Sequence, residues 1–186
     1  MPILKNSGAE WVEAVEIPSA GTGWNYDVLT YEFKRDLNAY LSQLAPSAIT
    51  RSLKDLIRFN QENSEEMLRY GQIQLIRSEE TSESLTEPAY IEALEFDFYH
   101  ATEQGIDYAF EKDQLDVIVF PSDEGSHISA KAGYPSIAVP VGFTSSGEPV
   151  GITFAGTAYS EPVLIEIAYA FEQLTKARKA PKLGFE

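Results

Sequence analysis

Apolar positions in the first half of the chain recur at three- and four-residue steps, which predicts helices with one apolar face. The first helix is expected over residues 26–44 and should end at Pro46. Ser52 with Asp55 predicts a capping box at the start of a second helix. A third helix is expected over residues 64–76, capped by its first residue.

A longer helical pattern follows an acidic connection, rich in serine and threonine, at residues 78–87. It begins at Pro88, which the first turn of a helix tolerates. Its apolar positions are Tyr90, Ile91, Leu94, Phe98, Ala101, Ile106, Ala109 and Phe110. Gly105 is expected to bend or divide this helix.

The hydrophobic pattern changes after Leu115, where runs rich in β-branched residues predict strands. The three runs cover residues 115–120, 136–141 and 150–155. The first suits a strand that is covered on both faces, as in α/β sheets. Pro140 has no amide hydrogen to donate, so its strand is expected to have an edge or a bulge there.

Both ends of the chain show further patterns. Residues 1–8 resemble the last turns of a helix that stops at a glycine, so the chain is expected to begin inside an element. Residues 11–17 alternate as a strand does. The final helix is expected to be capped by Ser160, with basic residues at 176–179 near the negative end of its dipole. Its predicted buried stripe is Leu164, Ile165, Ile167, Ala168, Phe171 and Leu174.

The chain has 186 residues, which is enough for one domain with a substantial core. It shows no internal repeat, and helical patterns precede and follow the strands. We therefore predict one α/β domain over residues 1–186.

The net charge of −15 comes from 29 carboxylates against 14 basic residues. Such a polyanion repels the phosphate backbone of nucleic acids and anionic membrane surfaces, so neither is an expected partner. The absence of cysteine excludes disulfides, a thiol nucleophile and thiolate metal sites. No apolar run approaches the ~20 residues that span a bilayer, and no signal peptide is recognised, so a cytoplasmic protein is expected.

A catalytic hydroxyl needs a base beside it, and the sequence offers few candidates. His100 falls in a helical pattern and is expected to have a structural or solvent-facing role. His127 follows Ser126, but neighbours in sequence form a dyad only if their side chains converge. Ser129 and Lys131 have one residue between them, whereas serine–lysine enzymes place two. Lys131 is therefore interpreted as a surface lysine in a loop.

Adjacent carboxylates such as Asp123–Glu124 and Glu65–Glu66 are expected by chance in so acidic a chain. Hard cations need several convergent oxygen ligands, and no calcium-loop pattern is present. The glycines show no phosphate-loop spacing. The sequence predicts neither a metal site nor a cofactor.

An ordered series of segments over nearly the whole chain is more specific. The segments are Tyr31–Leu41, Leu115–Pro121, Ala132–Gly142, Pro149–Gly156, Ser160–Leu164 and Ala168–Gln173. Together they resemble the carboxyl-terminal region of the amidase signature family, which includes bacterial amidases and the A subunit of glutamyl-tRNA amidotransferase. The resemblance implies a carboxyl-terminal fragment of an amidase-type domain, with a partial mixed β-sheet covered by helices.

The same resemblance implies hydrolysis of carboxamides through an acyl-serine intermediate. In that family a lysine activates a bridging serine, which activates the nucleophilic serine, and all lie in the amino-terminal portion with a Gly-Gly-Ser-Ser-Gly type of signature. Neither the lysine nor the signature is found here, and Ser145-Ser146-Gly147, the closest string, lies in a predicted turn. No catalytic residue is therefore assigned, and the chain alone is expected to be inactive.

The predicted loop over residues 122–134 follows the carboxyl end of a strand, where α/β folds usually place ligand contacts. Asp123, Ser126, His127 and Ser129 are therefore candidates for lining the substrate pocket of the parent enzyme. The alternative is a loop that only closes onto the missing amino-terminal half.

Two other functions stay open. A sheet cut from a larger one leaves a strand edge and an apolar face uncovered, which favours a non-catalytic interaction module that forms homo-oligomers. A subunit of a tRNA-dependent amidotransferase would act only with partner chains.

Overall fold

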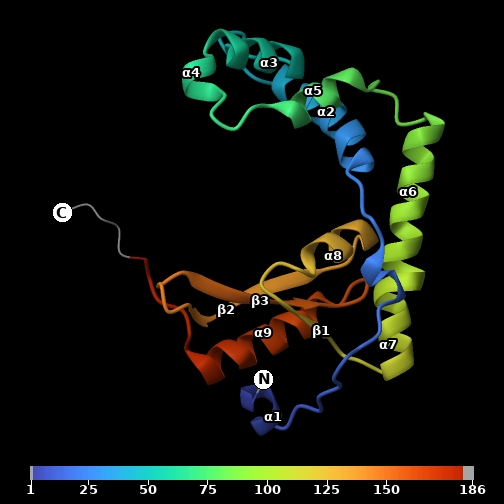
Figure 1. The fold of residues 1–186 in the computed structure, drawn as a ribbon, viewed down its shortest axis with the longest axis vertical. Coiled ribbons are helices and arrows are strands. Elements are labelled where there is room, and N and C mark those ends of the chain that lie inside the picture. The colour runs from blue at the N-terminus through green and yellow to red at the C-terminus, as the bar shows by residue number, and fades with distance from the viewer. Residues whose placement is uncertain (1, 182–186) are drawn as a thin grey trace. The chain divides into compact units, whose positions relative to one another are not determined.

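The computed structural model describes residues 2–181, which form two compact units (Figure 1). The sheet unit contains the residues up to Thr22 and those from Asp97 onward, and the helical unit contains residues 23–96. Each is described by itself. Compact units can share one domain, so the single domain over residues 1–186 stays a prediction.

The sheet unit carries all the strands among the described residues. Its elements are α1 (Pro2–Asn6), η1 (Pro18–Gly21), the π-helical η2 (Thr102–Ile106), α7 (Asp107–Asp113), β1 (Ile118–Pro121), α8 (Ser126–Ala132), β2 (Ser136–Phe143), β3 (Pro149–Ala155) and α9 (Glu161–Thr175).

Strand β3 lies between β1 and β2 and is antiparallel to both. Phe154 of β3 is in register with Val119 of β1 and Ile137 of β2. The register of β2 shifts between Pro140 and Gly142, and β2 is an edge strand of this sheet. Both features confirm the expectation for Pro140, because a bulge or an edge accommodates a residue that donates no hydrogen bond.

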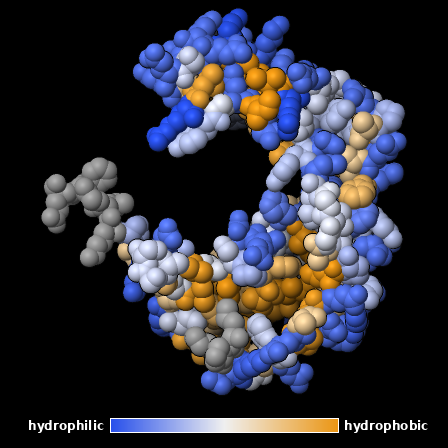
Figure 2. Space-filling view, viewed as in Figure 1, coloured by the Kyte–Doolittle hydropathy of each residue, from blue (hydrophilic) through white to orange (hydrophobic). Residues whose placement is uncertain are grey.

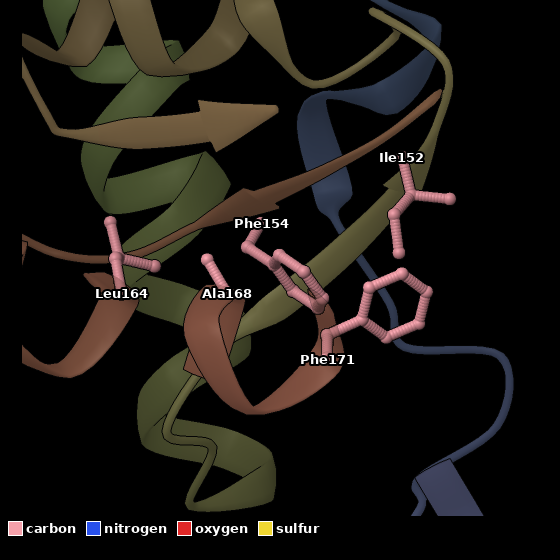
Figure 3. Packing of buried hydrophobic residues seen from close by; sticks show 5 residues of the cluster. All are labelled: Ile152, Phe154, Leu164, Ala168 and Phe171. Atoms are coloured by element: carbon pink, nitrogen blue, oxygen red, sulfur yellow. The ribbon is translucent and has the colours of Figure 1, made fainter. Parts of the chain in front are cut away.

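Helix α9 covers one face of the sheet, and α8 lies against the other (Figure 1). Leu164, Ala168 and Phe171 of α9 pack against Ile152 and Phe154 of β3 (Figure 3). The two phenylalanine rings have centroids 5.8 Å apart at 70°, the edge-to-face arrangement that ring quadrupoles favour. The predicted small sheet covered by helices is confirmed, but it was expected to be mixed, whereas the three strands of the described residues are all antiparallel.

The surroundings of α9 differ from the prediction in two details. Ile165 and Leu174 are more than half exposed, so the buried stripe is narrower than predicted. Ser160 precedes the helix, but its hydroxyl donates to the carbonyl of Thr157 at 2.7 Å and does not cap it. The prediction that basic residues lie near the negative end of the helix dipole is confirmed at Lys176, which is the C-cap residue of α9.

The helical unit is built from short helices. They are α2 (Asp27–Ser42), α3 (Leu53–Glu62), α4 (Ser64–Met67), α5 (Ile73–Glu80) and most of α6 (Pro88–Ala101). The hydroxyl of Ser52 accepts a hydrogen bond from the Asp55 amide at 3.1 Å, which confirms one half of the capping box. The Asp55 carboxylate accepts from the amide of Arg51, one residue earlier than the box requires.

Two predicted elements are wrong. The helix expected over residues 64–76 is divided into α4 and α5, because Gly71 lies between them in the left-handed conformation with a φ of 71°. Residues 11–17 form no strand, because Ala14 has a φ of 56° and breaks the alternation.

Helix α6 passes into η2, where Gly105 takes the non-helical values φ −126° and ψ −117°. This confirms that Gly105 divides the predicted helix. A Cβ atom there would lie 2.7 Å from the carbonyl oxygen of His100, so glycine permits the close approach of the two backbone segments.

The buried face of α6 also differs from the predicted stripe. Its buried residues are Tyr90, Ala93, Asp97 and Ala101. The predicted positions Ile91, Leu94 and Phe98 are exposed by 41–54%. Among the described residues, no helix is long and apolar enough to cross a bilayer.

Candidate functional site

The chain turns sharply between β1 and α8. Ser122 lies in the left-handed conformation, with a φ of 50°. Its amide donates a hydrogen bond to the Gly151 carbonyl at 3.0 Å, and its carbonyl accepts one from the Thr153 hydroxyl at 2.6 Å. These bonds fix the turn to β3. Gly125 lies against the ring of Phe120, where a Cβ would come within 2.2 Å of a ring atom. Any larger residue at Gly125 would displace the ring.

Residues 126–132, predicted as part of a loop, form helix α8. Gly133 ends the helix in the left-handed conformation, with a φ of 69°. A seven-residue helix is marginal by itself in water, so contacts with other elements decide its form. The local pattern alone did not contain that information.

The structure places the four candidate residues on the turn and on α8, but not in one cluster. Asp123 and His127 are exposed, Ser126 is half-buried, and Ser129 is 1% exposed. Ser126 and Ser129 are three residues apart and share a face of the helix, whereas His127 lies on another face. The exposed end of α8 therefore offers a carboxylate, an imidazole and a hydroxyl for hydrogen bonds to a polar ligand.

Lys131 lies on α8 and is not the surface lysine in a loop that was predicted. Its ammonium donates to Oδ2 of Asp97 on α6, and the two side chains are 15% and 4% exposed. Removing two charges from water costs several kcal/mol each, and their mutual attraction offsets this cost. Lys131 therefore joins α8 to α6 and is not positioned as a free base beside a serine.

Two buried polar atoms near this ion pair make no hydrogen bond to the part of the chain that the structure describes. They are Oδ1 of Asp97 and the hydroxyl oxygen of Ser129. An unsatisfied buried polar atom costs about 1–3 kcal/mol. These two unsatisfied atoms therefore lower the stability of the sheet unit where α6 meets α8.

Tyr134 fastens the carboxyl end of α8. Its hydroxyl donates to Oδ2 of Asp107 at 3.0 Å, and its amide donates to the Ser129 carbonyl at 2.9 Å. Burial, and then the hydrogen bond to Asp107, raise the pKa of Tyr134 to about 12. The hydroxyl therefore remains a donor at any physiological pH.

A cleft of about 780 Å³ lies beside β1 in the sheet unit. It is lined by residues 8–15 and 113–120, together with Leu4, Ile17, Phe154 and Ile167. Within residues 2–181, β1 pairs with a strand on one side only. The cleft therefore adjoins a strand whose second edge is available for pairing.

The second histidine and the adjacent carboxylates add no further site. The ring of His100 lies edge-on to the ring of Tyr99, with centroids 5.2 Å apart. Asp123, Glu124, Glu65 and Glu66 are all exposed. Over residues 2–181, no group of three or more histidine and carboxylate side chains is placed to hold a metal ion.

Asp97 was missed from the sequence, although a signal was present. It lies four and seven residues from Ala101 and Tyr90 on α6, so the three share one helical face. A carboxylate on a buried face needs a partner, which would have pointed to a buried cation. The predicted stripe included Tyr90 and Ala101 but was centred on Leu94 and Phe98, so Asp97 was left outside it.

No protein-family model matches the chain. A protein of Arabidopsis thaliana named as a probable amidase is 38% identical over 96% of this chain and 36% of its own length. Native peptide amidase from Stenotrophomonas maltophilia superimposes with a TM-score of 0.78 and 41% identity, over 91% of this chain and 37% of that one. An amidase family protein from Bacillus anthracis gives a TM-score of 0.83 and 34% identity, over 98% and 35%. The chain thus spans little more than a third of each relative.

Proposed function

We propose that the chain is a member of the amidase signature family and supplies the carboxyl-terminal part of a domain that hydrolyses carboxamides through an acyl-serine intermediate. The observation that carries this proposal is the match to peptide amidase, at 41% identity and a TM-score of 0.78 over 91% of the chain. Agreement in sequence and in fold over nearly every element supports a shared role for these residues.

Residues 1–186 by themselves are proposed to be inactive. The sequence contains no match to the family's lysine and serine signature. The one lysine near the candidate serines, Lys131, is paired with Asp97, and Ser129 is buried. A hydroxyl without a base beside it is a weak nucleophile at neutral pH.

The proposed partner is the amino-terminal part of an amidase chain. Its support is the free edge of β1, the adjoining cleft of about 780 Å³, and the exposed apolar residues Ile165 and Tyr169 on α9. An unpaired strand beside apolar surface favours the addition of another strand. Without that partner, the same surfaces favour self-association of the isolated chain.

In the assembled enzyme, the turn after β1 and the start of α8 are proposed to line the substrate pocket. Asp123, Ser126 and His127 present polar groups there, whereas Ser129, the fourth candidate, is buried on α8. Their place after the carboxyl end of a strand supports this role.

A chimaera tests the proposal. Residues 1–186 replace the matching region of the Stenotrophomonas peptide amidase, and hydrolysis of peptide amides is compared with that of the chain alone. We expect turnover by the chimaera and none by the chain. Turnover by the purified chain, or a folded chimaera that hydrolyses nothing, would overturn the proposal.

Within an active chimaera, Asp123→Asn tests the proposed pocket. We expect KM to rise several-fold, because the substrate loses an interaction with a charged group. Glu124→Gln is the matched control, since Glu124 is the exposed neighbour on the same turn. Equal KM values for the two variants would remove Asp123 from the pocket.

A further inference from the structure

Three enclosed polar side chains belong to the region where α8 meets α6 and η2. Asp97 is 3% exposed, Ser129 is 1% exposed, and the side chain of Lys131 is 15% exposed. Elsewhere the sheet unit joins helix to strand through apolar side chains such as Phe154 and Phe171, and Figure 2 shows hydrophobic residues gathered over its strands and α9. The attachment of α8 is therefore polar in a unit that is held mainly by apolar packing.

This polar attachment is not the arrangement that stability alone favours. An ion pair removed from water is often no more stabilising than apolar side chains of similar volume. Oδ1 of Asp97 and the hydroxyl oxygen of Ser129 also make no hydrogen bond within residues 2–181. Proteins retain such departures from good packing mainly where a function depends on them. The junction of α6 and α8 is therefore a candidate for a functional role.

An ion pair with a hydrogen bond supplies direction, which apolar contacts lack. The ammonium of Lys131 donates to Oδ2 of Asp97, and a hydrogen bond weakens steeply when its groups lose their alignment. A second such bond joins the hydroxyl of Tyr134, just beyond α8, to a carboxylate of α7 at 3.0 Å. The middle of the helix has only Ile128 against Gly105, which offers no side chain to interlock with. The rotation of α8 about its axis therefore depends on the polar contacts.

The ion pair is linked to the exposed end of α8 by the geometry of the helix. His127 and Lys131 are four residues apart, so they lie on one face about a single turn apart. A rotation of α8 that misaligns Lys131 with Asp97 also redirects His127, and Ser126 beside it. The direction of these polar groups is thus tied to the ion pair in the last turn of the helix.

We propose that Asp97 and Lys131 are positioning residues for the amidase reaction: their ion pair fixes the rotation of α8 and thereby directs His127 and Ser126 toward the substrate. Neither member of the pair touches the substrate. The inference rests on the proposed function, because it concerns the pocket assigned there to the turn after β1 and the start of α8. It deepens that function by naming what controls substrate binding at this site.

The test uses the active chimaera with Lys131→Met, with Asp97→Leu/Lys131→Met, and with the control Lys112→Met at the exposed pair with Glu16. Lys131→Met should raise KM for a peptide amide at least about fivefold, because small misplacements of binding groups are costly. The double variant buries no charge and regains stability, but it lacks the directional bond, so its KM should stay raised to a similar extent. Lys112→Met should leave KM within about twofold of the unmodified chimaera.

The double variant separates positioning from simple stabilisation. A loss of stability alone reduces the amount of folded enzyme, which lowers the apparent kcat and leaves KM unchanged. A double variant that regains both stability and the original KM would contradict the proposal, because the pair would then only stabilise. A Lys131→Met chimaera whose KM changes no more than that of Lys112→Met would contradict it as well.

Hydrogen exchange in the 186-residue chain supplies a readout that involves no catalysis. The amide of Ser129 donates to the carbonyl of Gly125 at 3.2 Å, so its exchange reports opening of α8. In the double variant, this amide should exchange at least about fivefold faster relative to the amides of β3, because α8 loses its directional bond while the core around Phe154 is intact. Unchanged relative exchange would refute the proposal whether or not the chimaera is active.

The two experiments distinguish a failure of this inference from a failure of the proposed function. A chimaera that folds but hydrolyses nothing rejects the proposed function, and with it the role of the pair in substrate binding. An active chimaera whose double variant has an ordinary KM rejects the positioning role and keeps the amidase function.

Discussion

The sheet unit and the helical unit are stabilised in different ways. In the sheet unit, Phe154 and Phe171 expose no surface and anchor a continuous apolar core. In the helical unit Leu53 is fully buried, but Leu29 and Ile73 are more than half exposed. Apolar burial contributes roughly 25 cal/mol for each Å² removed from water, so the helical unit gains less from it.

Polar contacts also hold the helical unit together. Tyr31 donates to Glu87 at 2.9 Å, and Tyr90 donates to Glu32 at 2.7 Å. A single hydrogen bond of this kind contributes only about 0.5–1.5 kcal/mol net. The comparison shows that the sheet unit is stabilised by its own apolar core. The stability of the helical unit depends more on the surface that covers its exposed apolar residues.

The largest expected effect is at the centre of the sheet unit. Phe171→Ala should lower the free energy of unfolding by about 4 kcal/mol, because it removes a fully buried ring and leaves a cavity. Urea unfolding of the chain, followed by circular dichroism, measures the change. The matched control is Ile165→Ala on the same helix, which is 59% exposed and should cost less than about 1 kcal/mol. Similar losses for both variants would mean that α9 does not bury the face described.

The second effect concerns the ion pair between α6 and α8. Lys131→Met should lower the free energy of unfolding by about 3 kcal/mol, because Asp97 is left charged and buried. The double variant with Asp97→Leu should recover most of this loss, since no charge is then buried. Unfolding in urea measures both.

The exposed pair of Lys112 and Glu16, with side chains 44% and 58% exposed, supplies the control. Lys112→Met should cost less than about 1 kcal/mol, as surface pairs do. If Lys131→Met lowers the free energy of unfolding by no more than Lys112→Met does, the pair of Lys131 and Asp97 is as hydrated as a surface pair. Its role in holding α8 against α6 is then refuted.

The sequence was informative wherever a local pattern and the tertiary environment agreed. The three strands follow from β-branched runs, the bulge after Pro140 from its missing donor, and the division at Gly105 from a glycine inside a helical pattern. Each of these features depends mainly on the residue itself and its neighbours in the chain.

The rest depends on contacts between distant residues, which no local pattern reports. Helix α8 is held by Asp97 and Asp107, 34 and 27 residues before their partners Lys131 and Tyr134. The buried face of α6 was misjudged because Ile91 and Leu94 are more apolar than the residues that are in fact enclosed. The candidate site was placed on the right segment, but the helical form that separates His127 from Ser126 and Ser129 could not be foreseen.

The smallest expected effect sharpens the comparison from the side of the helical unit. Ser52→Ala should cost about 1 kcal/mol, because the Asp55 amide loses its acceptor at the start of α3. Ser64→Ala is the control: Ser64 is the first helical residue of α4 and follows its N-cap residue Asn63, so the cost should be a few tenths of a kcal/mol. Hydrogen exchange measures where each loss falls. If the helical unit opens separately, Ser52→Ala speeds exchange in α3 and leaves β3 unchanged, since local opening does not require the core around Phe154 to unfold. Faster exchange in β3 by the same factor would show that the two units unfold as one, and the difference drawn between them would then lie in their packing and not in their stability.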